Sequence, residues 1–172
     1  NLIGAWQQDR WSNGGARGLG GAYSLDGGGT WTRTSAPFSR CTGGNEGNGG
    51  NYERATDPWV SFAPDGTAYQ VALAFNNQTN ADNAILVSRS ADGGRTWSNP
   101  VTLRRDGAAS FNDKEAITAD RFVDQQIGDI RRPLGAQHRP SLLQPVFQVG
   151  HRRGRARLEI EDREGAGLSE AA

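Results

Sequence analysis

The sequence predicts an all-β protein, and three observations favour that class. Glycine and tryptophan are frequent, at 24 and 5 of 172 residues, as in chains with many short strands and tight turns. The chain twice spells nearly the same eight letters, SLDGGGTW at 24–31 and SADGGRTW at 90–97. Runs rich in β-branched and aromatic residues stand at matching distances around both copies. We therefore expect a repeated unit of antiparallel strands.

The unit around the second motif is expected to hold four consecutive strands. Residues 57–69 predict a hairpin over Asp65-Gly66, because Gly adopts positive φ without strain and Asp-Gly favours a two-residue turn. TAYQVALAFN (67–76) and NAILVSRS (83–90) supply the second and third strands, and TWSNPVTL, which includes the end of the motif, supplies the fourth.

The unit around the first motif shows the same pattern without an opening strand. LIGAWQQD (2–9) and RGLGGAYS (17–24) occupy the matching places, and TWTRTSA supplies the last strand. A third unit is expected to begin at FNDKEAITAD (111–120), where Asp113 repeats the place of Asp57. We expect the repeat to span residues 1–127.

The stretch 128–172 differs in composition from the repeat. Residues 131–157 hold seven arginines and no acidic residue, and no strand-like run of useful length follows residue 126. Three interpretations stay open: an out-of-frame translation of GC-rich DNA, a disordered Arg-rich tail, and a nucleic-acid-binding arm. The whole chain has a formal net charge of zero, so its overall charge does not favour a nucleic-acid partner.

The repeated motif has a metal-binding and a structural interpretation. A calcium loop of the EF-hand type needs a closing Glu, but the twelfth positions counted from Asp26 and Asp92 are Pro37 and Leu103. In the structural interpretation the Asp accepts from backbone N–H groups two residues on and the glycines adopt positive φ. The Thr then starts the next strand, and the Trp packs between sheets. We therefore expect ten architectural residues: Ser24, Asp26, Gly28, Thr30, Trp31, Ser90, Asp92, Gly94, Thr96 and Trp97.

This pattern, Ser-x-Asp-x-Gly-x-Thr-Trp, resembles the Asp-box, or BNR repeat, of the sialidase superfamily of β-propellers. Two full matches in equivalent strand contexts carry the resemblance, which covers about residues 1–125. It implies a partial β-propeller of about two four-stranded blades plus the start of a third, followed by a tail outside the propeller. It also implies a secreted or cell-surface protein of which this chain is a fragment.

The resemblance further implies where a ligand binds. Up-and-down strands place both motifs and the Asp65-Gly66 turn at one end of the sheets and the long polar loops at the other. A sialidase-like enzyme binds the carboxylate of its sugar through arginines, and it uses an Asp acid/base with a Tyr nucleophile supported by Glu. The candidates at the loop end are Asp113 and Asp57 as catalytic residues and Arg54, Lys114 and Arg10 as substrate-binding residues.

The implied function is hydrolysis of a glycan or glycoconjugate that carries terminal sialic acid or a related sugar. The Arg-Ile-Pro segment and the later blades of that family are absent, so we expect an incomplete active site. The alternative is a non-catalytic Asp-box propeller that binds glycan or protein, since a fold does not determine a function. With one cysteine and no apolar run of about 20 residues, we expect no metal site, cofactor or membrane span. Open blade edges favour self-association.

Overall fold

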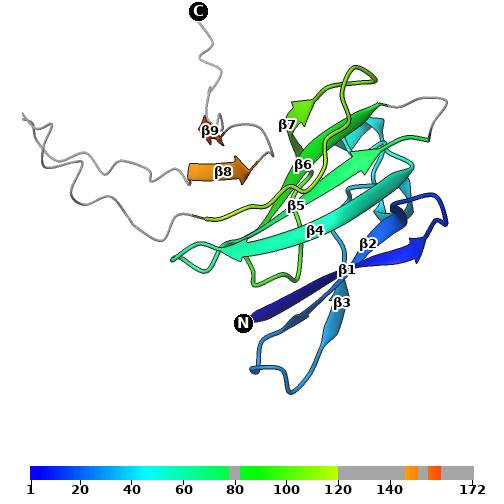
Figure 1. The fold of residues 1–172 in the computed structure, drawn as a ribbon. Coiled ribbons are helices and arrows are strands. Elements are labelled where there is room, and N and C mark those ends of the chain that lie inside the picture. Colours follow the sequence, from blue (N-terminus) through cyan, green and yellow to red (C-terminus); the bar gives the residue numbers. More distant parts are fainter. Residues whose placement is uncertain (78–81, 120–145, 151–154, 160–172) are drawn as a thin grey trace, which may run out of the picture.

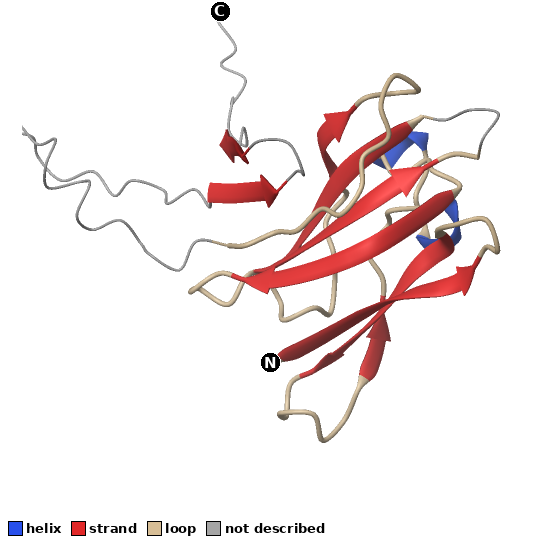
Figure 2. Cartoon of the chain, viewed as in Figure 1, coloured by secondary structure: helices blue, strands red, loops and turns tan. Residues whose placement is uncertain are grey.

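The computed structural model describes residues 1–77, 82–119, 146–150 and 155–159, and these form an all-β protein (Figures 1 and 2). Their helices are two three-residue 3-10 turns, η1 (Arg40–Thr42) and η2 (Glu46–Asn48). In this described part no helix has the length and apolarity needed to cross a membrane. The predicted all-β class is confirmed.

One open antiparallel sheet forms the body of the molecule (Figure 1). Two meanders make it up, and we call residues 1–35 the first unit and residues 54–105 the second unit. Within the sheet, a single strand-paired residue pair, Ala16 with Ala55, connects the two units. Neighbouring strands follow the order β1 (Leu2–Arg10), β2 (Ala16–Ser24), β4 (Arg54–Phe62), β5 (Ala68–Phe75), β6 (Asn83–Ser90) and β7 (Val101–Arg105), and β3 (Thr32–Thr34) pairs with β2.

The long strands lie where the sequence predicts them. β6 covers residues 83–90 as expected, and β1 and β2 match the two runs of the first unit. β4 and β5 flank the expected turn, in which Gly66 has a φ of 86° and the Thr67 N–H donates to the Asp65 carboxylate at 2.9 Å. Alternation and turn chemistry therefore predicted the meanders correctly.

The first motif folds into a turn that its own side chains hold together. The Ser24 hydroxyl donates to Asp26 Oδ1 at 2.7 Å and accepts from the Gly28 N–H at 2.8 Å. Thr30 donates to the same carboxylate through its N–H at 2.9 Å and through its hydroxyl at 2.7 Å. The Asp thus accepts from the residue four positions on, and the expected bond from two positions on is wrong.

The second motif repeats this geometry. Ser90 bonds Asp92 and the Gly94 N–H at 2.8 Å each, and the Thr96 N–H donates to Asp92 at 3.0 Å. Bonds from the Thr96 hydroxyl and N–H lower the pKa of Asp92 to about 2, and the matching bonds lower the pKa of Asp26. Both carboxylates therefore stay ionised at neutral pH as acceptors.

Because of these bonds, the strands after the motifs begin later in the sequence than expected. β3 begins at Thr32 and β7 at Val101, so the expectation that Thr30 and Thr96 start strands is wrong. Each threonine donates back to the motif aspartate, and the chain at that position therefore stays in the turn.

The two motif tryptophans have different surroundings. Trp97 packs against the buried core as expected, but Trp31 is 51% exposed. The Trp31 indole N–H donates to the Gly28 carbonyl at 3.1 Å. The expected packing between sheets is therefore wrong for Trp31, because no described element covers its side of the first unit.

Both faces of the sheet in the second unit are buried. Ile117 and Ala119 of the 111–119 segment cover one face, and Leu19 of β2 and Phe38 of the β3–β4 loop cover the other. This two-sided burial explains why β5 and β6 read as continuous apolar runs. The covered side chains are Tyr69, Val71, Ile85 and Val87 on the first face and Ala72, Ala74, Ala84 and Leu86 on the second.

The 111–119 segment lies along this face without forming the expected strand. Its end is attached by the Ala119 N–H, which donates to the Ser61 hydroxyl at 3.0 Å, and residues 111–118 have no strand assignment. Ala119 alone has a bridge assignment. The segment expected to open a third unit therefore packs on the face of the second unit and, up to residue 118, does not pair as a strand.

Two short strands occur in the region that was expected to hold none. β8 (Val146–Gly150) and β9 (Arg155–Glu159) pair in an antiparallel two-stranded sheet, so that expectation is wrong for these ten residues. VFQVG contains the β-branched and aromatic residues that favour strands. The remainder of 128–172, with its three interpretations, lies outside the described residues.

Asp92→Ala is expected to destabilise the protein. The change removes the acceptor of three bonds, which at roughly 1 kcal/mol each predicts a loss of about 2 kcal/mol after partial relaxation, measured by urea unfolding. Asp65→Ala removes one such bond and serves as the matched control, with a loss of about 1 kcal/mol or less. Equal losses for the two variants would contradict an architectural role for the motif.

Candidate functional site

The long polar loops meet at one end of the sheet, as the sequence predicts. The Asn83 amide donates to the carbonyls of Gly107 and Ser110 at 2.7 and 2.8 Å, which ties the loop after β7 to the start of β6. The rings of Phe75 and Phe111 meet edge to face with centroids 5.3 Å apart. We call this end, formed by residues 10–16, 40–57, 75–77, 82–83 and 104–115, the loop end.

The motif turns meet at the opposite end. The Thr34 hydroxyl in the first unit donates to the Arg95 carbonyl of the second motif at 3.3 Å. A Cβ built on Gly93 would lie 3.2 Å from the Leu25 side chain, so the two turns are in contact. Structural turns and polar loops therefore occupy separate ends, which leaves the loop end for ligands.

Asp57 and Lys114 come together at the loop end. The Lys114 ammonium lies 3.8 Å from Asp57 Oδ2, and Asp57 Oδ1 accepts from the Thr56 hydroxyl at 3.1 Å and from the Gln7 amide at 3.5 Å. β4 bulges here, with a register shift between Thr56 and Trp59. The bulge turns Asp57 out of the regular strand.

The backbone conformation of Asp57 recurs at Lys114. Their φ angles are 49° and 62°, values that non-glycine residues adopt uncommonly. Asp9 at the end of β1 shares this conformation, with a φ of 56°, and the match of Asp57 with Asp113 stays a prediction. Asp113, which precedes Lys114, is exposed.

Glu115 is the residue at this site that the sequence analysis did not select. It is 4% exposed, and among the described residues neither carboxylate oxygen makes a well-formed hydrogen bond, although the N–H groups of Glu115 and Leu73 interact with it weakly. Burial raises the pKa of Glu115 to about 7, and the charges of Asp57 and Asp113 add to the rise, against partial compensation by its own N–H and that of Leu73. Its place two residues before the buried Ile117 was the available signal, since alternate residues of an extended segment share a face.

Arg54 is committed to contacts inside the protein. It is 7% exposed and donates to the Asn13 side chain and the Gly14 carbonyl at 2.8 Å each. Its guanidinium also lies 4.7 Å from the centre of the Trp11 ring. Arg54 therefore holds the β1–β2 loop against β4.

The other arginines of the loop end are dispersed. Arg10 is exposed at the end of β1, and Arg17 lies 6.0 Å from the Trp11 ring centre. Arg104 pairs with Asp106 at 2.6 Å, and Arg105 pairs with Asp82 through bonds of 3.0 and 2.6 Å. In the described part of the chain Arg17 and Arg54 share the Trp11 ring, whereas Arg104 and Arg105 pair with separate aspartates.

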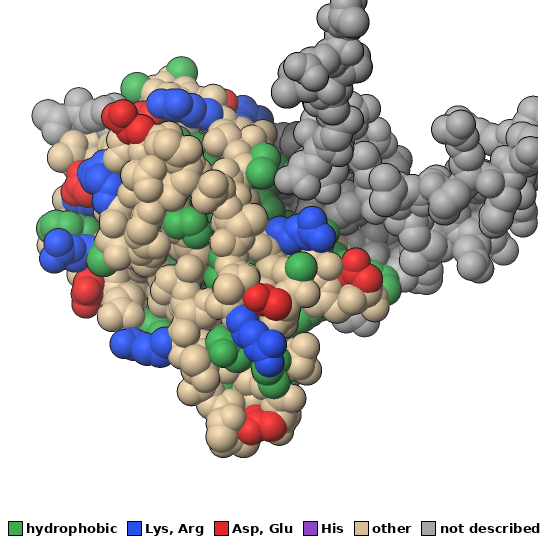
Figure 3. Space-filling view, turned by 180° about the vertical axis from the view of Figure 1, so that it is seen from behind, with side chains coloured by type: hydrophobic (Ala, Val, Ile, Leu, Met, Phe, Trp, Pro, Cys, Tyr) green, Lys and Arg blue, Asp and Glu red, His purple; other side chains and the backbone are tan. Residues whose placement is uncertain are grey.

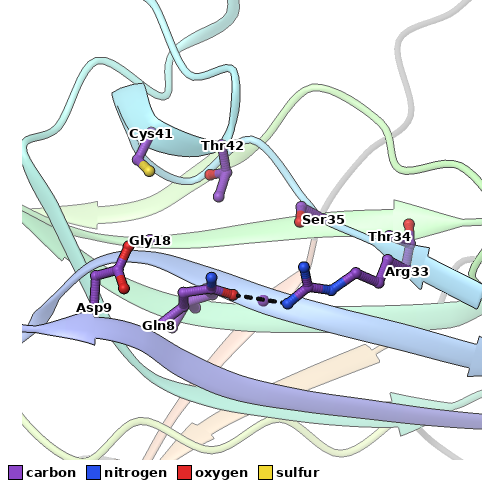
Figure 4. A pocket seen from close by; sticks show the side chains of 10 residues that line it. Gln8, Asp9, Gly18, Arg33, Thr34, Ser35, Cys41 and Thr42 are labelled. Atoms are coloured by element: carbon purple, nitrogen blue, oxygen red, sulfur yellow. Dashed lines mark hydrogen bonds between the residues drawn. The ribbon is translucent and has the colours of Figure 1, made fainter.

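A hollow of about 220 Å³ lies between β1, β2, β3 and η1, and Asp9, the residue before Arg10, lines it (Figure 4). The Arg33 guanidinium donates to the Gln8 amide oxygen at 3.4 Å, Asp9 lies beside Gln8, and the exposed Cys41 lies on η1 (Figure 4). None of the five predicted site residues lines it.

Charge is distributed evenly over the visible surface. The face in Figure 3 carries acidic and basic side chains interspersed among polar ones, without a patch of one sign. Among the described residues no three His, Cys, Asp or Glu side chains are grouped to hold a metal ion. The ionisable side chains at the loop end are carboxyl groups, arginines and one lysine.

The fold and site define an all-β protein with two identical Ser-Asp-Thr turns and a carboxyl-rich loop end. No protein-family model matches the chain, and no match was found among the curated proteins. The repeat and the geometry above therefore carry the functional argument.

Glu115→Gln is expected to remove a pH dependence of stability. The folded pKa of about 7 lies above the ordinary 4.5, so this group's contribution is complete below pH 4.5 and is lost as the pH rises to 7. The difference corresponds to about 3 kcal/mol in the free energy of unfolding. Urea unfolding from pH 4.5 to 8 should show the variant gaining on the wild type as pH increases.

The exposed Glu46→Gln is the control and should follow the wild type at every pH. A wild-type pH profile that Glu115→Gln leaves unchanged would contradict the burial of a carboxyl group without a well-formed hydrogen bond.

Proposed function

We propose that this chain is part of a sialidase-like Asp-box β-propeller that acts on a glycan with terminal sialic acid or a related sugar. The second unit is one complete blade, and the first unit is a blade without its opening strand. Two motif turns with the same bonding pattern support the proposal, as does the packing of Leu19 of the first unit against the buried face of the second unit. A secreted or cell-surface location belongs to the same proposal.

The observation that carries the hydrolase proposal is the convergence of carboxyl groups from two successive repeats. Asp57 comes from β4, and Asp113 and Glu115 come from the corresponding part of the next repeat. Glycoside hydrolysis needs a carboxyl group that gives and takes a proton near neutral pH. Asp57 and Asp113 are the acid/base candidates, and Lys114 and Arg10 are the exposed cations available to a carboxylated sugar.

The second candidate is a non-catalytic Asp-box protein that binds glycan or protein. The arginines favour it, because Arg54 donates to Asn13 and Gly14, and Arg104 and Arg105 are paired with separate aspartates. A sugar carboxylate needs guanidinium groups that converge on one point. On this alternative the loop end recognises a glycan and no bond is broken.

Sialyllactose binding, followed by NMR, tests both candidates. We expect a dissociation constant in the millimolar range, about 4 kcal/mol, and at least tenfold weaker binding of lactose, which lacks the carboxylate. The double variant Asp57→Asn/Asp113→Asn should change the NMR response to sialyllactose. Asp65→Asn, at the opposite end of the sheet, should leave that response unchanged.

A fluorogenic sialoside separates the two candidates. Its hydrolysis, lost in the double variant, supports the hydrolase and contradicts the binding protein, whereas binding without hydrolysis fits the binding protein and a hydrolase whose active site is incomplete in this chain. A folded chain that neither binds sialyllactose nor cleaves the sialoside would contradict both.

A further inference from the structure

Trp11 is an exposed indole at the loop end that its neighbours fix in place. It lies in the β1–β2 loop and is 39% exposed. The Trp11 N–H donates to the Gly15 carbonyl at 3.0 Å, and the Gly14 N–H donates to the Trp11 carbonyl at 3.2 Å. The buried Arg54 bonds the same turn at Gly14 and lies 4.7 Å from the centre of the Trp11 ring. The position of this ring is therefore set before any ligand arrives.

The loop that carries Trp11 also packs on its neighbours at the loop end. A Cβ built on Gly15 would lie 2.5 Å from the Phe75 ring, so the loop and this ring are in direct contact. Phe75 in turn contacts Phe111 edge to face. These contacts join the β1–β2 loop to the end of β5 and to the segment that carries Asp113 and Lys114.

Arg17 adds a positive charge beside the exposed ring. Its side chain is exposed, and its guanidinium lies 6.0 Å from the centre of the Trp11 ring. Unlike Arg104 and Arg105, it is paired with no carboxylate within the described part of the chain. An indole and a guanidinium side by side offer one ligand an apolar surface and an anion-binding group.

We propose that Trp11 stacks on a sugar ring of the glycan and that Arg17 makes the site favour an anionic sugar. The C–H groups on one face of a pyranose ring form an apolar surface that packs on an indole, and a guanidinium binds both oxygens of a carboxylate. The inference rests on the proposed glycan function. It applies to the hydrolase and to the binding protein alike, because neither residue takes part in breaking a bond.

NMR of the isotope-labelled full chain with sialyllactose tests the stacking directly. Trp11 is one of five tryptophans, and its indole N–H signal is the one that Trp11→Phe lacks. This signal should shift when sialyllactose is added, because the sugar changes the surroundings of the ring. The signal of Trp31, which is 51% exposed at the opposite end of the sheet, is the internal control and should stay in place.

Substitutions measure what each side chain contributes to binding. Trp11→Ala should weaken sialyllactose binding about tenfold, and Trp11→Phe should weaken it less, since Phe keeps an aromatic face. Arg17→Gln should bring the affinities for sialyllactose and lactose to within about twofold of each other, because the carboxylate loses its cation. Trp31→Ala is the matched control and should bind like the wild type. Thermal melting establishes that each variant is folded.

The outcomes distinguish this inference from the function on which it rests. Sialyllactose binding without a shift of the Trp11 signal, or with unchanged affinity in Trp11→Ala, would overturn the stacking and leave the glycan function standing. Equal losses for Trp11→Ala and Trp31→Ala would do the same. A folded chain that binds no sialyllactose would overturn both.

Discussion

The structure depends on covering the second unit's sheet on both sides. β5 and β6 carry apolar side chains on both faces, and strands of this kind are stable only with a packed layer on each side. The first unit supplies one layer, and the 111–119 segment supplies the other. The positions of both covers, and of the loops that lead into them, follow from this requirement.

The need for a packed layer on each side of the sheet also explains the raised pKa of Glu115 at the loop end. Ile117 and Ala119 must reach the sheet, and the extended segment that carries them also places Glu115 inward. A carboxyl group buried without a well-formed hydrogen bond favours its neutral form, which is why the pKa of Glu115 rises. Proton uptake near neutral pH is thus a consequence of apolar packing by its neighbours.

The motif turns, in contrast to Glu115, are determined by residues close together in the sequence. Every bond that holds them lies within seven residues, so two copies in different surroundings adopt the same geometry. What differs is the final tryptophan, which is packed in one copy and exposed in the other. The local turn is autonomous, whereas the burial of its tryptophan depends on a neighbouring layer.

The sequence by itself determined the all-β class, the limits of the long strands, the motif turns and the meeting of the polar loops at one end. Those features depend on alternation, on Asp-Gly turns and on side chains a few residues apart. Only the tertiary structure decided that Arg54 bonds Asn13 and Gly14, that Lys114 adopts a positive φ, that Glu115 is buried and that Trp31 is exposed. Arg54, Glu115 and Trp31 owe their surroundings to contacts between segments far apart in the chain, or to the lack of them, and the kink at Lys114 lies in a segment packed on a distant strand. No local pattern encodes such pairings, because each is decided by which surfaces the fold must cover.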